Sequence, residues 1–318
     1  MLHEAIPVVP LMRLHPTGKF DNSSAQYRTI TAKPLAASMG AEISGVDVRK
    51  LTDAQAQEIR HSLFRHKMIY FRGQKLTHED HEAFSRHFGS FAEDAYTSGV
   101  PGHRNVHPLI KEADDPSKMV FGEGWHTDSP FLAAPPAITI LRSVQVPPFG
   151  GDTTFANSAL AYSMLSDTYR EMIRNLKVHF SLRDVLKSAQ EAVVESDSPI
   201  GRLASTRNAE RLSDDLLRKI RGNAHPMVRT HPESGEKALY VDTSYAVGIE
   251  GMEAEESAPI LRYLGEHITQ PALSCRLRWE ADMLVLWDNR LCVHQAYNDY
   301  QGHRRELYRT TVAGEKPV

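Results

Sequence analysis

The hydrophobic and polar positions near the start of the chain follow the spacing of short strands. Residues 27–35 and 41–48 are rich in β-branched residues and are punctuated by glycine, which indicates strands. Residues 68–72 form a short apolar run, which is typical of a buried strand. Three strands are therefore expected before residue 73.

Two helices are predicted in the same region. In residues 51–67 the apolar positions recur with helical spacing on one face, and Thr52 precedes them as a capping residue. Residues 77–89 repeat this arrangement, with Thr77 as the cap, acidic residues in the first turn and Gly89 as the end.

From about residue 105 the pattern becomes mainly that of β-structure. Strands are predicted over 105–113, 137–146 and 152–156, within 274–300, and over 304–314. Residues 224–242 predict a hairpin with its turn at 232–236. Many short strands separated by Gly and Pro turns favour a sandwich or barrel, so the fold class is mainly β with flanking helices.

The pattern indicates a single domain over residues 1–318, because no segment has the composition of a linker. Residues 1–26 are expected to form a loose N-terminal arm. Residues 181–223 are charged and helical in pattern, and they are long for a connection inside a β core. We therefore expect a lid-like helical insertion over one mouth of the barrel.

Composition narrows the class of protein. The net charge of −3 gives no reason to expect nucleic acid or an anionic membrane as a partner. The two cysteines, Cys275 and Cys292, are too few for a disulfide framework and favour a reduced compartment. No uninterrupted apolar run resembles a signal peptide or a membrane span. A cytoplasmic protein is expected.

Two His-x-Asp triplets are candidate metal-binding motifs, His126-Thr127-Asp128 and His78-Glu79-Asp80. A chain of this composition would contain about one such triplet by chance, so the spacing alone identifies neither as a metal site. The second falls in the first turn of a predicted helix, where residues two apart point in different directions and cannot share an ion. His81 and Glu82, in the same helix, are expected to be solvated. In an extended backbone, His126 and Asp128 point to the same side.

The third ligand is predicted to be His294, which lies on one face of a predicted strand with Cys292 and Ala296. Two histidines and one carboxylate form the facial triad of non-haem Fe(II) oxygenases, which leaves three coordination positions open. Zinc accepts the same ligand types. A lone histidine in a strand is more often a hydrogen-bonded core residue, so His294 alone decides nothing.

The predicted last strand adds an anion-binding pattern. Arg305, Leu307 and Arg309 share one face of it. If that face points inward, two guanidinium groups are covered, which is costly unless anions meet them. Arginine suits this role because its planar fork binds carboxylates in a bidentate manner. An outward-facing charged strand remains the alternative.

The chain resembles the Fe(II)/2-oxoglutarate-dependent dioxygenases of the taurine dioxygenase and (2,4-dichlorophenoxy)acetate dioxygenase (TauD/TfdA) family. The resemblance runs from about Thr31 to the C-terminus. It is carried by ordered motifs, GAEISGVDVR, MIYFRGQ, WHTDSPFLAAPP, GGDTTFA, HPMVRTHPESGEKALYV, WDNRLCVHQAYNDY and RRELYRTTVAGEKP. It implies a double-stranded β-helix (jelly roll) and a homo-oligomer.

The resemblance also implies roles for individual residues. The metal ligands would be His126, Asp128 and His294, which would bind Fe(II). Thr153 would contact the C1 carboxylate end of 2-oxoglutarate, and Arg305 would pair with its distal carboxylate. Arg309 would face the active site, where it can hold an anionic group of the primary substrate.

The implied reaction consumes O₂ and 2-oxoglutarate, releases succinate and CO₂, and hydroxylates a small organic anion, either a carboxylate or a sulfonate, with or without net cleavage. Taurine-specific relatives place a histidine and an asparagine where this chain has Asp94 and Gly122, which argues against taurine itself. Trp287 to Arg290 are expected to brace His294, since ligand histidines usually need an outer hydrogen-bond partner.

Two other classes of protein remain open on the sequence. One is a metal-binding β-barrel without redox chemistry, such as a zinc hydrolase or a cupin-like binding protein. The other is a catalytically silent relative, which the five retained residues of the triad and cosubstrate site disfavour.

Overall fold

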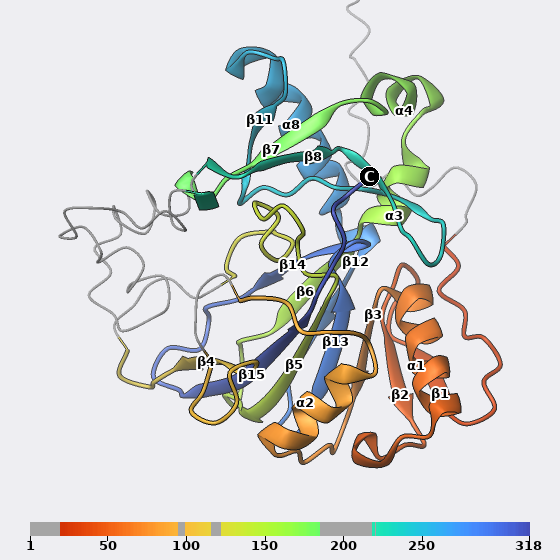
Figure 1. Ribbon diagram of the computed structural model, residues 1–318, viewed down its shortest axis with the longest axis vertical. Coiled ribbons are helices and arrows are strands. Elements are labelled where there is room, and N and C mark those ends of the chain that lie inside the picture. Colours follow the sequence, from red (N-terminus) through yellow and green to blue (C-terminus); the bar gives the residue numbers. More distant parts are fainter. Residues whose placement is uncertain (1–19, 95–98, 116–121, 185–217, 220) are drawn as a thin grey trace, which may run out of the picture.

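Two β-sheets packed face to face form the centre of the protein, as Figure 1 shows. The computed structural model describes residues 20–94, 99–115, 122–184, 218–219 and 221–318. The larger sheet has seven strands, in the order β1 (Thr31–Pro34), β2 (Ala41–Ser44), β3 (Met68–Phe71), β13 (Leu284–Asp288), β5 (Ile138–Gln145), β15 (Arg305–Val312) and β4 (His107–Lys111). The smaller facing sheet has the order β12 (Ser274–Leu277), β6 (Thr153–Asn157) and β14 (Cys292–Ala296).

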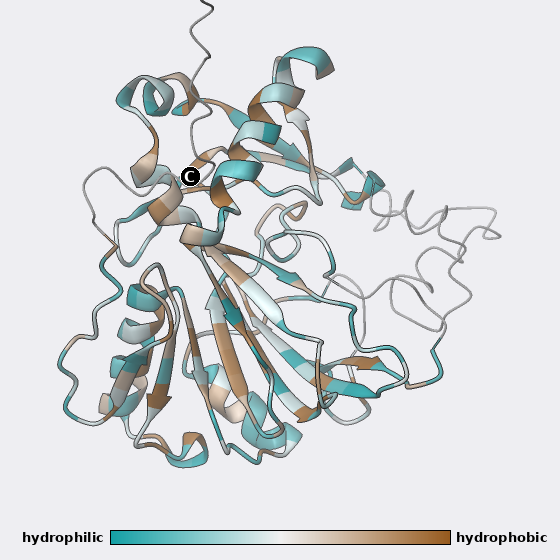
Figure 2. Cartoon of the chain, turned by 180° about the vertical axis from the view of Figure 1, so that it is seen from behind, coloured by the Kyte–Doolittle hydropathy of each residue, from teal (hydrophilic) through white to brown (hydrophobic). Residues whose placement is uncertain are grey.

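The core between these sheets follows from strand alternation. In β13, Val285 and Trp287 point toward the smaller sheet and pack with Phe155 of β6 and Leu277 of β12. The alternate residues of β13 face the opposite side. Both faces of β13 are covered, and residues 284–287 are accordingly all hydrophobic; stretches of brown run through the central strands in Figure 2. The fold is the double-stranded β-helix, or jelly roll, that the family resemblance implied.

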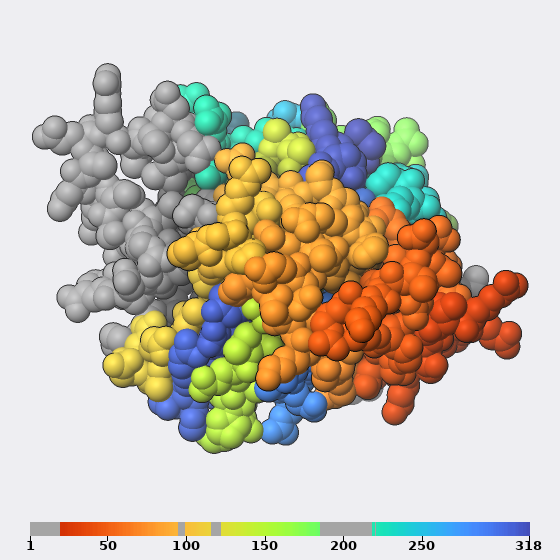
Figure 3. All heavy atoms as spheres, turned by 60° about the horizontal axis from the view of Figure 1, so that its bottom comes forward, coloured from red at the N-terminus to blue at the C-terminus, as the bar shows by residue number. Residues whose placement is uncertain are grey.

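Two helices cover the outer face of the larger sheet. Helix α1 (Asp53–His66) and helix α2 (His78–Arg86) place Leu63 and Phe84 in one cluster with Leu284 and Leu286 of β13. In Figure 3 the orange atoms around α2 lie between the red N-terminal residues and the blue and green strands.

Both helices begin where the sequence predicted. The side chain of Thr52 accepts a hydrogen bond from the backbone of Gln55, and that of Thr77 accepts one from the backbone of Asp80. In each case the later side chain binds back to the capping residue. The second helix ends at Arg86, three residues before Gly89.

One expectation for α2 was wrong. His81 and Glu82 were expected to be solvated, but both are buried. The reason is that α2 lies across β15, so that His81 Nε2 comes 3.2 Å from the hydroxyl of Thr310 and Glu82 binds Asn105 at 3.1 Å. Helical spacing located the helix, but only the sheet beneath it decided which polar residues are covered.

A second layer lies above the jelly roll in Figure 1. It contains a sheet in the order β11 (Ala246–Ile249), β7 (Lys177–Phe180) and β8 (Asn223–Pro226). Around it lie α3 (Ser158–Met164), α4 (Asp167–Ile173) and α8 (Ala254–Ile268), none of which the sequence patterns above singled out. Short 3₁₀ helices occur at Val48–Lys50 and Pro271–Leu273.

The predicted hairpin over 224–242 is present in part. Strands β9 (Val228–Thr230) and β10 (Lys237–Leu239) pair around the predicted turn. Strand β8, just before them, pairs with β7 instead. The predicted lid over 181–223 lies almost wholly outside the described residues, and so do residues 1–19 of the predicted arm.

Candidate active site

Two chain segments bring three potential metal ligands together. His126 pairs with His294 of β14 through two backbone hydrogen bonds of 2.9 and 2.8 Å, so their side chains lie next to each other. The ring centroids are 4.2 Å apart. Asp128 follows two residues after His126, and its Oδ1 atom is 3.9 Å from Nε2 of each histidine. The triad predicted from the sequence is therefore assembled in space.

The protonation states of the triad suit a divalent metal. His126 Nδ1 lies 2.7 Å from the carbonyl oxygen of Gly124, which can only accept; in the neutral tautomer that donates this bond, Nε2 carries the lone pair. Burial and the neighbouring His126 lower the pKa of His294 to about 3, which keeps this imidazole neutral. Burial alone would raise the pKa of Asp128, but His294, Arg309, His126 and the Thr139 hydrogen bond lower it overall.

These groups offer one carboxylate oxygen and two imidazole nitrogens, all within 4.8 Å of one another and all buried. Such a set fits a divalent transition metal with open coordination positions. The donor set fits zinc also, so the triad alone does not identify the metal.

All six predicted site residues line one cavity. The triad shares its walls with Thr153 at the start of β6 and with Arg305 and Arg309 of β15. The remaining lining residues are mostly apolar: Leu109, Gly122, Leu141, Trp287 and Ala296. A small polar molecule would therefore meet the triad and the cationic groups in largely apolar surroundings.

Arg305 has the surroundings of an anion-binding group. Within the described part of the chain no carboxylate forms an ion pair with it, and its Nε atom is buried without a hydrogen-bond partner. Burial lowers the pKa of Arg305 from its usual value. Its guanidinium lies 5.7 Å from the ring centre of Trp279 and 5.9 Å from that of Tyr300. A largely covered cation in this state would be stabilised by an anion.

Thr153 and Arg305 share a neighbour, Trp279. The indole nitrogen of Trp279 donates to the hydroxyl oxygen of Thr153 at 3.0 Å. Trp279 thus contacts both Thr153 and Arg305. This single indole fixes the relative position of the two residues predicted to hold the cosubstrate.

In the C-terminal strand, β15, the face that carries Arg305, Leu307 and Arg309 points inward, as anion binding requires. Leu307 and Arg309 are buried, and Arg305 and Arg309 both reach the cavity. On the opposite face, Arg304 forms an ion pair with Glu112 at 2.9 Å. The outward-facing alternative is therefore wrong.

Arg309 has a partner that the sequence reasoning missed. Its Nη2 atom donates to Oδ2 of Asp94 at 2.5 Å, and its Nη1 atom lies 3.8 Å from Oδ1 of Asp128. Asp94 follows α2 and is far from Arg309 in sequence. The available signal was that Asp94 occupies the place of a histidine in taurine-specific relatives.

Asn289 braces the aspartate of the triad. The indole of Trp287 donates to Oδ1 of Asn289, whose amide donates to the hydroxyl of Thr139, both at 2.9 Å. Thr139 in turn donates to Oδ2 of Asp128. Trp287 to Arg290 were expected to brace His294. They do so only through ring packing, since the ring centroid of Trp287 lies 4.7 Å from that of His294. Among the described residues, Nδ1 of His294 has no hydrogen-bond partner.

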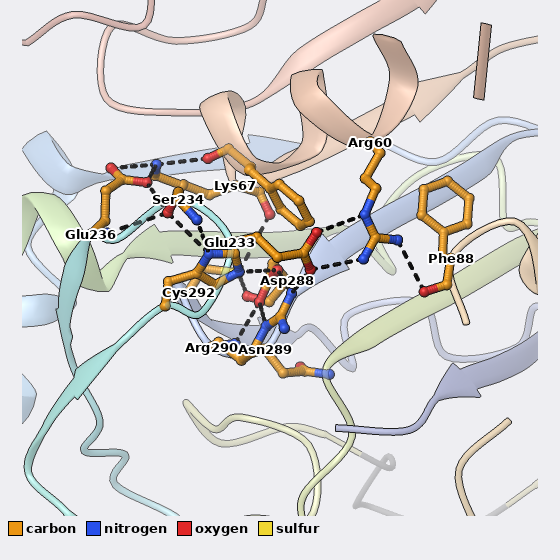
Figure 4. A network of polar contacts seen from close by, with 12 residues as sticks. Arg60, Lys67, Phe88, Glu233, Ser234, Glu236, Asp288, Asn289, Arg290 and Cys292 are labelled. Atoms are coloured by element: carbon orange, nitrogen blue, oxygen red, sulfur yellow. Dashed lines mark hydrogen bonds and ion pairs between the residues drawn. The ribbon is translucent and has the colours of Figure 1, made fainter. Parts of the chain in front are cut away.

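Asp288 and Arg290 of the same motif belong to a buried ionic network, drawn in Figure 4. Asp288 accepts two hydrogen bonds from the guanidinium of Arg290, at 2.9 and 2.7 Å, and one from His231 at 3.1 Å. Glu233 lies 3.6 Å from Arg290 and binds Arg60 of α1 at 2.7 Å. The network ties the turn before β14, which carries His294, to the β9–β10 turn and to α1.

A larger hollow of about 560 Å³ lies beside this network and away from the triad. Its buried cation, Lys67, is already paired with Glu236 at 2.7 Å, and Glu233 in its wall is paired with Arg60. The chemistry of the triad and of Arg305 therefore favours the smaller cavity as the active site.

Two further features bear on the surroundings of the protein. Cys275 and Cys292 are both buried free thiols. In the described part of the chain, no helix combines the length and the apolar character that crossing a membrane requires.

Comparison with known proteins gives consistent matches over almost the whole chain. The family model described as "Taurine catabolism dioxygenase TauD, TfdA family" matches residues 31–311. An α-ketoglutarate-dependent sulfate ester dioxygenase of Pseudomonas putida is 35% identical over 288 residues, which cover 90% of this chain and 90% of that protein.

Solved structures agree. A taurine dioxygenase from Burkholderia xenovorans superposes with a TM-score of 0.74 at 35% identity, covering 92% of this chain and 93% of that one. The structure of AAD-2 in complex with Mn(II) and N-oxalylglycine superposes with a TM-score of 0.70 at 28% identity, covering 91% and 99%.

Proposed function

The chain belongs to the TauD/TfdA family of Fe(II)- and 2-oxoglutarate-dependent dioxygenases, and from this premise we propose that it hydroxylates a small organic anion, either a carboxylate or a sulfonate. Relatives named for sulfate esters and for taurine support this substrate class. A non-redox metal-binding barrel is disfavoured, because the family and its similar members are dioxygenases.

The observation that carries the proposal is the convergence of His126, Asp128 and His294 in one cavity with Arg305. We assign the three triad residues as the iron ligands. Each would offer one donor atom to the ion, and three protein donors would leave coordination positions open for a chelating cosubstrate and for O₂. A closed zinc site would need a fourth protein ligand or a water instead.

We assign Arg305 and Thr153 to 2-oxoglutarate. Arg305 would bind the distal carboxylate with its guanidinium fork. The hydrogen bonds to the carboxylate would take the place of those that the covered guanidinium cannot make to water. Thr153 would donate a hydrogen bond to the other end. When bound, iron and 2-oxoglutarate supply the oxidising chemistry, with succinate and CO₂ as products from the cosubstrate.

The chain's remaining residues set the conditions for this chemistry. Leu109, Leu141 and Ala296 give the cavity apolar walls, which exclude water from the reacting groups. Arg309 would contact the polar group of the primary substrate from its place beside the triad.

One anaerobic titration tests the proposal. Fe(II) is added to the purified protein, followed by 2-oxoglutarate, and the visible spectrum is recorded. A weak charge-transfer band that saturates with 2-oxoglutarate is expected, together with succinate once O₂ is admitted. A protein that binds Zn(II) tightly but gives neither band nor succinate would be the non-redox barrel instead.

We also propose three features of the whole molecule. The chain would act as a single domain, with residues 181–223 as a lid; limited proteolysis with and without cosubstrate tests this. It would form a homo-oligomer, which light scattering measures. The two free thiols favour the cytoplasm, which fractionation of cells would test.

A further inference from the structure

The guanidinium that faces the primary substrate is not an isolated cation. Arg309 lies in the cavity wall with the triad, and its Nη2 atom donates to Asp94 at 2.5 Å. The side chains of Arg309 and Asp94 are only 6% and 2% exposed. Because both partners are shielded from water and salt, this ion pair persists where a surface pair would be screened.

Three separate elements hold the pair in place. Arg309 is paired across the sheet with His107 of β4, and Nδ1 of His107 lies 3.9 Å from Oδ1 of Asp94. Asp94 comes from the loop after α2. The second amino group of Arg309 is directed toward Asp128, at 3.8 Å from its Oδ1 atom. Arg309 therefore lies between two buried carboxylates.

The effect of Asp94 follows from the formal charges of a site that holds Fe(II) and 2-oxoglutarate. The charges of Fe(II) and 2-oxoglutarate cancel, and so do those of Asp128 and Arg305. Asp94 then cancels Arg309, so these described groups together carry no net charge before the primary substrate enters. With a neutral residue in place of Asp94, one positive charge would remain beside the triad for an anion to compensate.

We propose that Asp94 is a specificity-determining residue, which neutralises Arg309 so that the primary substrate meets this guanidinium through an uncharged oxygen, such as a carbonyl, ether or hydroxyl group. The anionic group of the substrate then lies away from Arg309. This inference rests on the proposed function and narrows its substrate class to organic anions whose charge is remote from the end next to Arg309.

Asp94 would affect a neutral oxygen and an anionic group differently when either approaches Arg309. A guanidinium in an ion pair still donates hydrogen bonds and can serve a neutral oxygen. A compact sulfonate or carboxylate placed on it would come close to both Asp94 and Asp128, and like charges in a buried site repel strongly. Asp94 thus discriminates by opposing the wrong substrate as well as by orienting Arg309.

A matched pair of ligands tests the inference on the unmodified enzyme. Butanesulfonate and butanesulfonamide have nearly the same shape, but only the first is anionic. Each is titrated anaerobically into enzyme loaded with Fe(II) and 2-oxoglutarate, and the shift of the visible chelate band gives its affinity. We expect the sulfonamide to bind at least as tightly as the sulfonate. Binding of the sulfonate tenfold or more tightly than the sulfonamide overturns the inference.

A charge-removing variant tests it independently. In Asp94→Asn the affinity for butanesulfonate should rise at least tenfold over the wild type. Glu93→Gln is the matched control, because it removes a neighbouring but exposed carboxylate, and it should bind butanesulfonate like the wild type. Equal or weaker butanesulfonate binding by Asp94→Asn, or none in either protein, contradicts the role of Asp94.

The two proposals fail in different ways. If the chelate band does not form in the wild type, the proposed function is wrong and the role of Asp94 falls with it. If the band and uncoupled succinate formation are normal but butanesulfonate prefers the wild type, only the role of Asp94 is wrong. If Asp94→Asn does not fold, the ligand pair on the wild type still decides.

Discussion

The hydroxyl of Thr139 donates a hydrogen bond to Oδ2 of Asp128, while the other oxygen, Oδ1, lies 3.9 Å from Nε2 of both triad histidines. The direction of this bond is fixed by Asn289, whose amide donates to the oxygen of Thr139 and leaves the hydroxyl proton for Asp128. The carboxylate is thus held with one oxygen occupied and one directed at the metal site. Partners of this kind orient a ligand and hold its charge.

Replacement of Thr139 by valine should weaken metal binding. Valine has the same shape but no hydroxyl, so Oδ2 of Asp128 loses its donor and the carboxylate can rotate. Loss of such a partner typically costs roughly 10- to 100-fold in metal affinity. Titration of the apoprotein with Mn(II) or anaerobic Fe(II), followed by intrinsic fluorescence, measures the change.

Thr139→Ser is the control for this substitution, because it keeps the hydroxyl and should keep metal affinity near the wild-type value. Serine and valine variants with the same affinity would show that the hydrogen bond does not position Asp128.

His126→Ala should abolish the chelate band. The substitution removes one of three donors and leaves a site too weak to hold the metal in a fixed geometry. His78→Ala is the control, since His78 belongs to the other His-x-Asp triplet and contacts Arg142 rather than the triad. Anaerobic absorption spectra of the two variants decide the matter. A wild-type band in His126→Ala would remove this residue from the metal shell.

Arg305→Ala should mainly raise the dissociation constant of 2-oxoglutarate. Hydrogen bonds to charged groups contribute about 1.5–3 kcal/mol, which corresponds to roughly 10- to 100-fold in affinity. Iron binding should change little, because Arg305 is assigned to the cosubstrate. The chelate band, titrated with 2-oxoglutarate, gives the constant.

Arg304→Ala serves as the control for Arg305→Ala, since it removes the neighbouring guanidinium on the outer face, where it pairs with Glu112. Equal losses of 2-oxoglutarate affinity in the two variants would refute the assignment of Arg305.

Asp288→Asn should destabilise the whole domain. Asp288 is fully buried and accepts hydrogen bonds from Arg290 and His231, so its loss leaves a buried cation without its main partner. Breaking a buried pair in this way costs about 3–5 kcal/mol. Denaturant unfolding measures the free energy, and a loss under about 1 kcal/mol would show that the network is not important for stability.

The same residue predicts a pH dependence of stability. Burial alone would raise the pKa of Asp288, but Arg290 and His231 lower it well below its ordinary value. A lowered folded-state pKa contributes stability above the unfolded-state value, near 3.9, and loses it as the pH falls. Unfolding free energies should therefore decrease between about pH 5 and pH 3. This part of the decrease should be absent in Asp288→Asn.

Local sequence determined the helix starts and most strands of the jelly roll. Thr52 and Thr77 cap α1 and α2 because a capping hydrogen bond spans only three residues. The two-residue period of 304–314 placed Arg305 and Arg309 on one face, because successive side chains of a strand alternate. The triad was found because His-x-Asp and the later histidine lie in recognisable motifs.

The partners of these residues depended on the tertiary structure. Asp94 reaches Arg309, and Thr139 reaches Asp128, only because distant strands and loops are packed together. His81 was expected in solvent and is buried, since nothing in a nine-residue helix states which sheet will cover it. A single sequence fixes local geometry through short-range hydrogen bonds and periodicity. Long-range packing alone decides which buried charges meet, and in this protein that determines how Arg309 can receive a substrate.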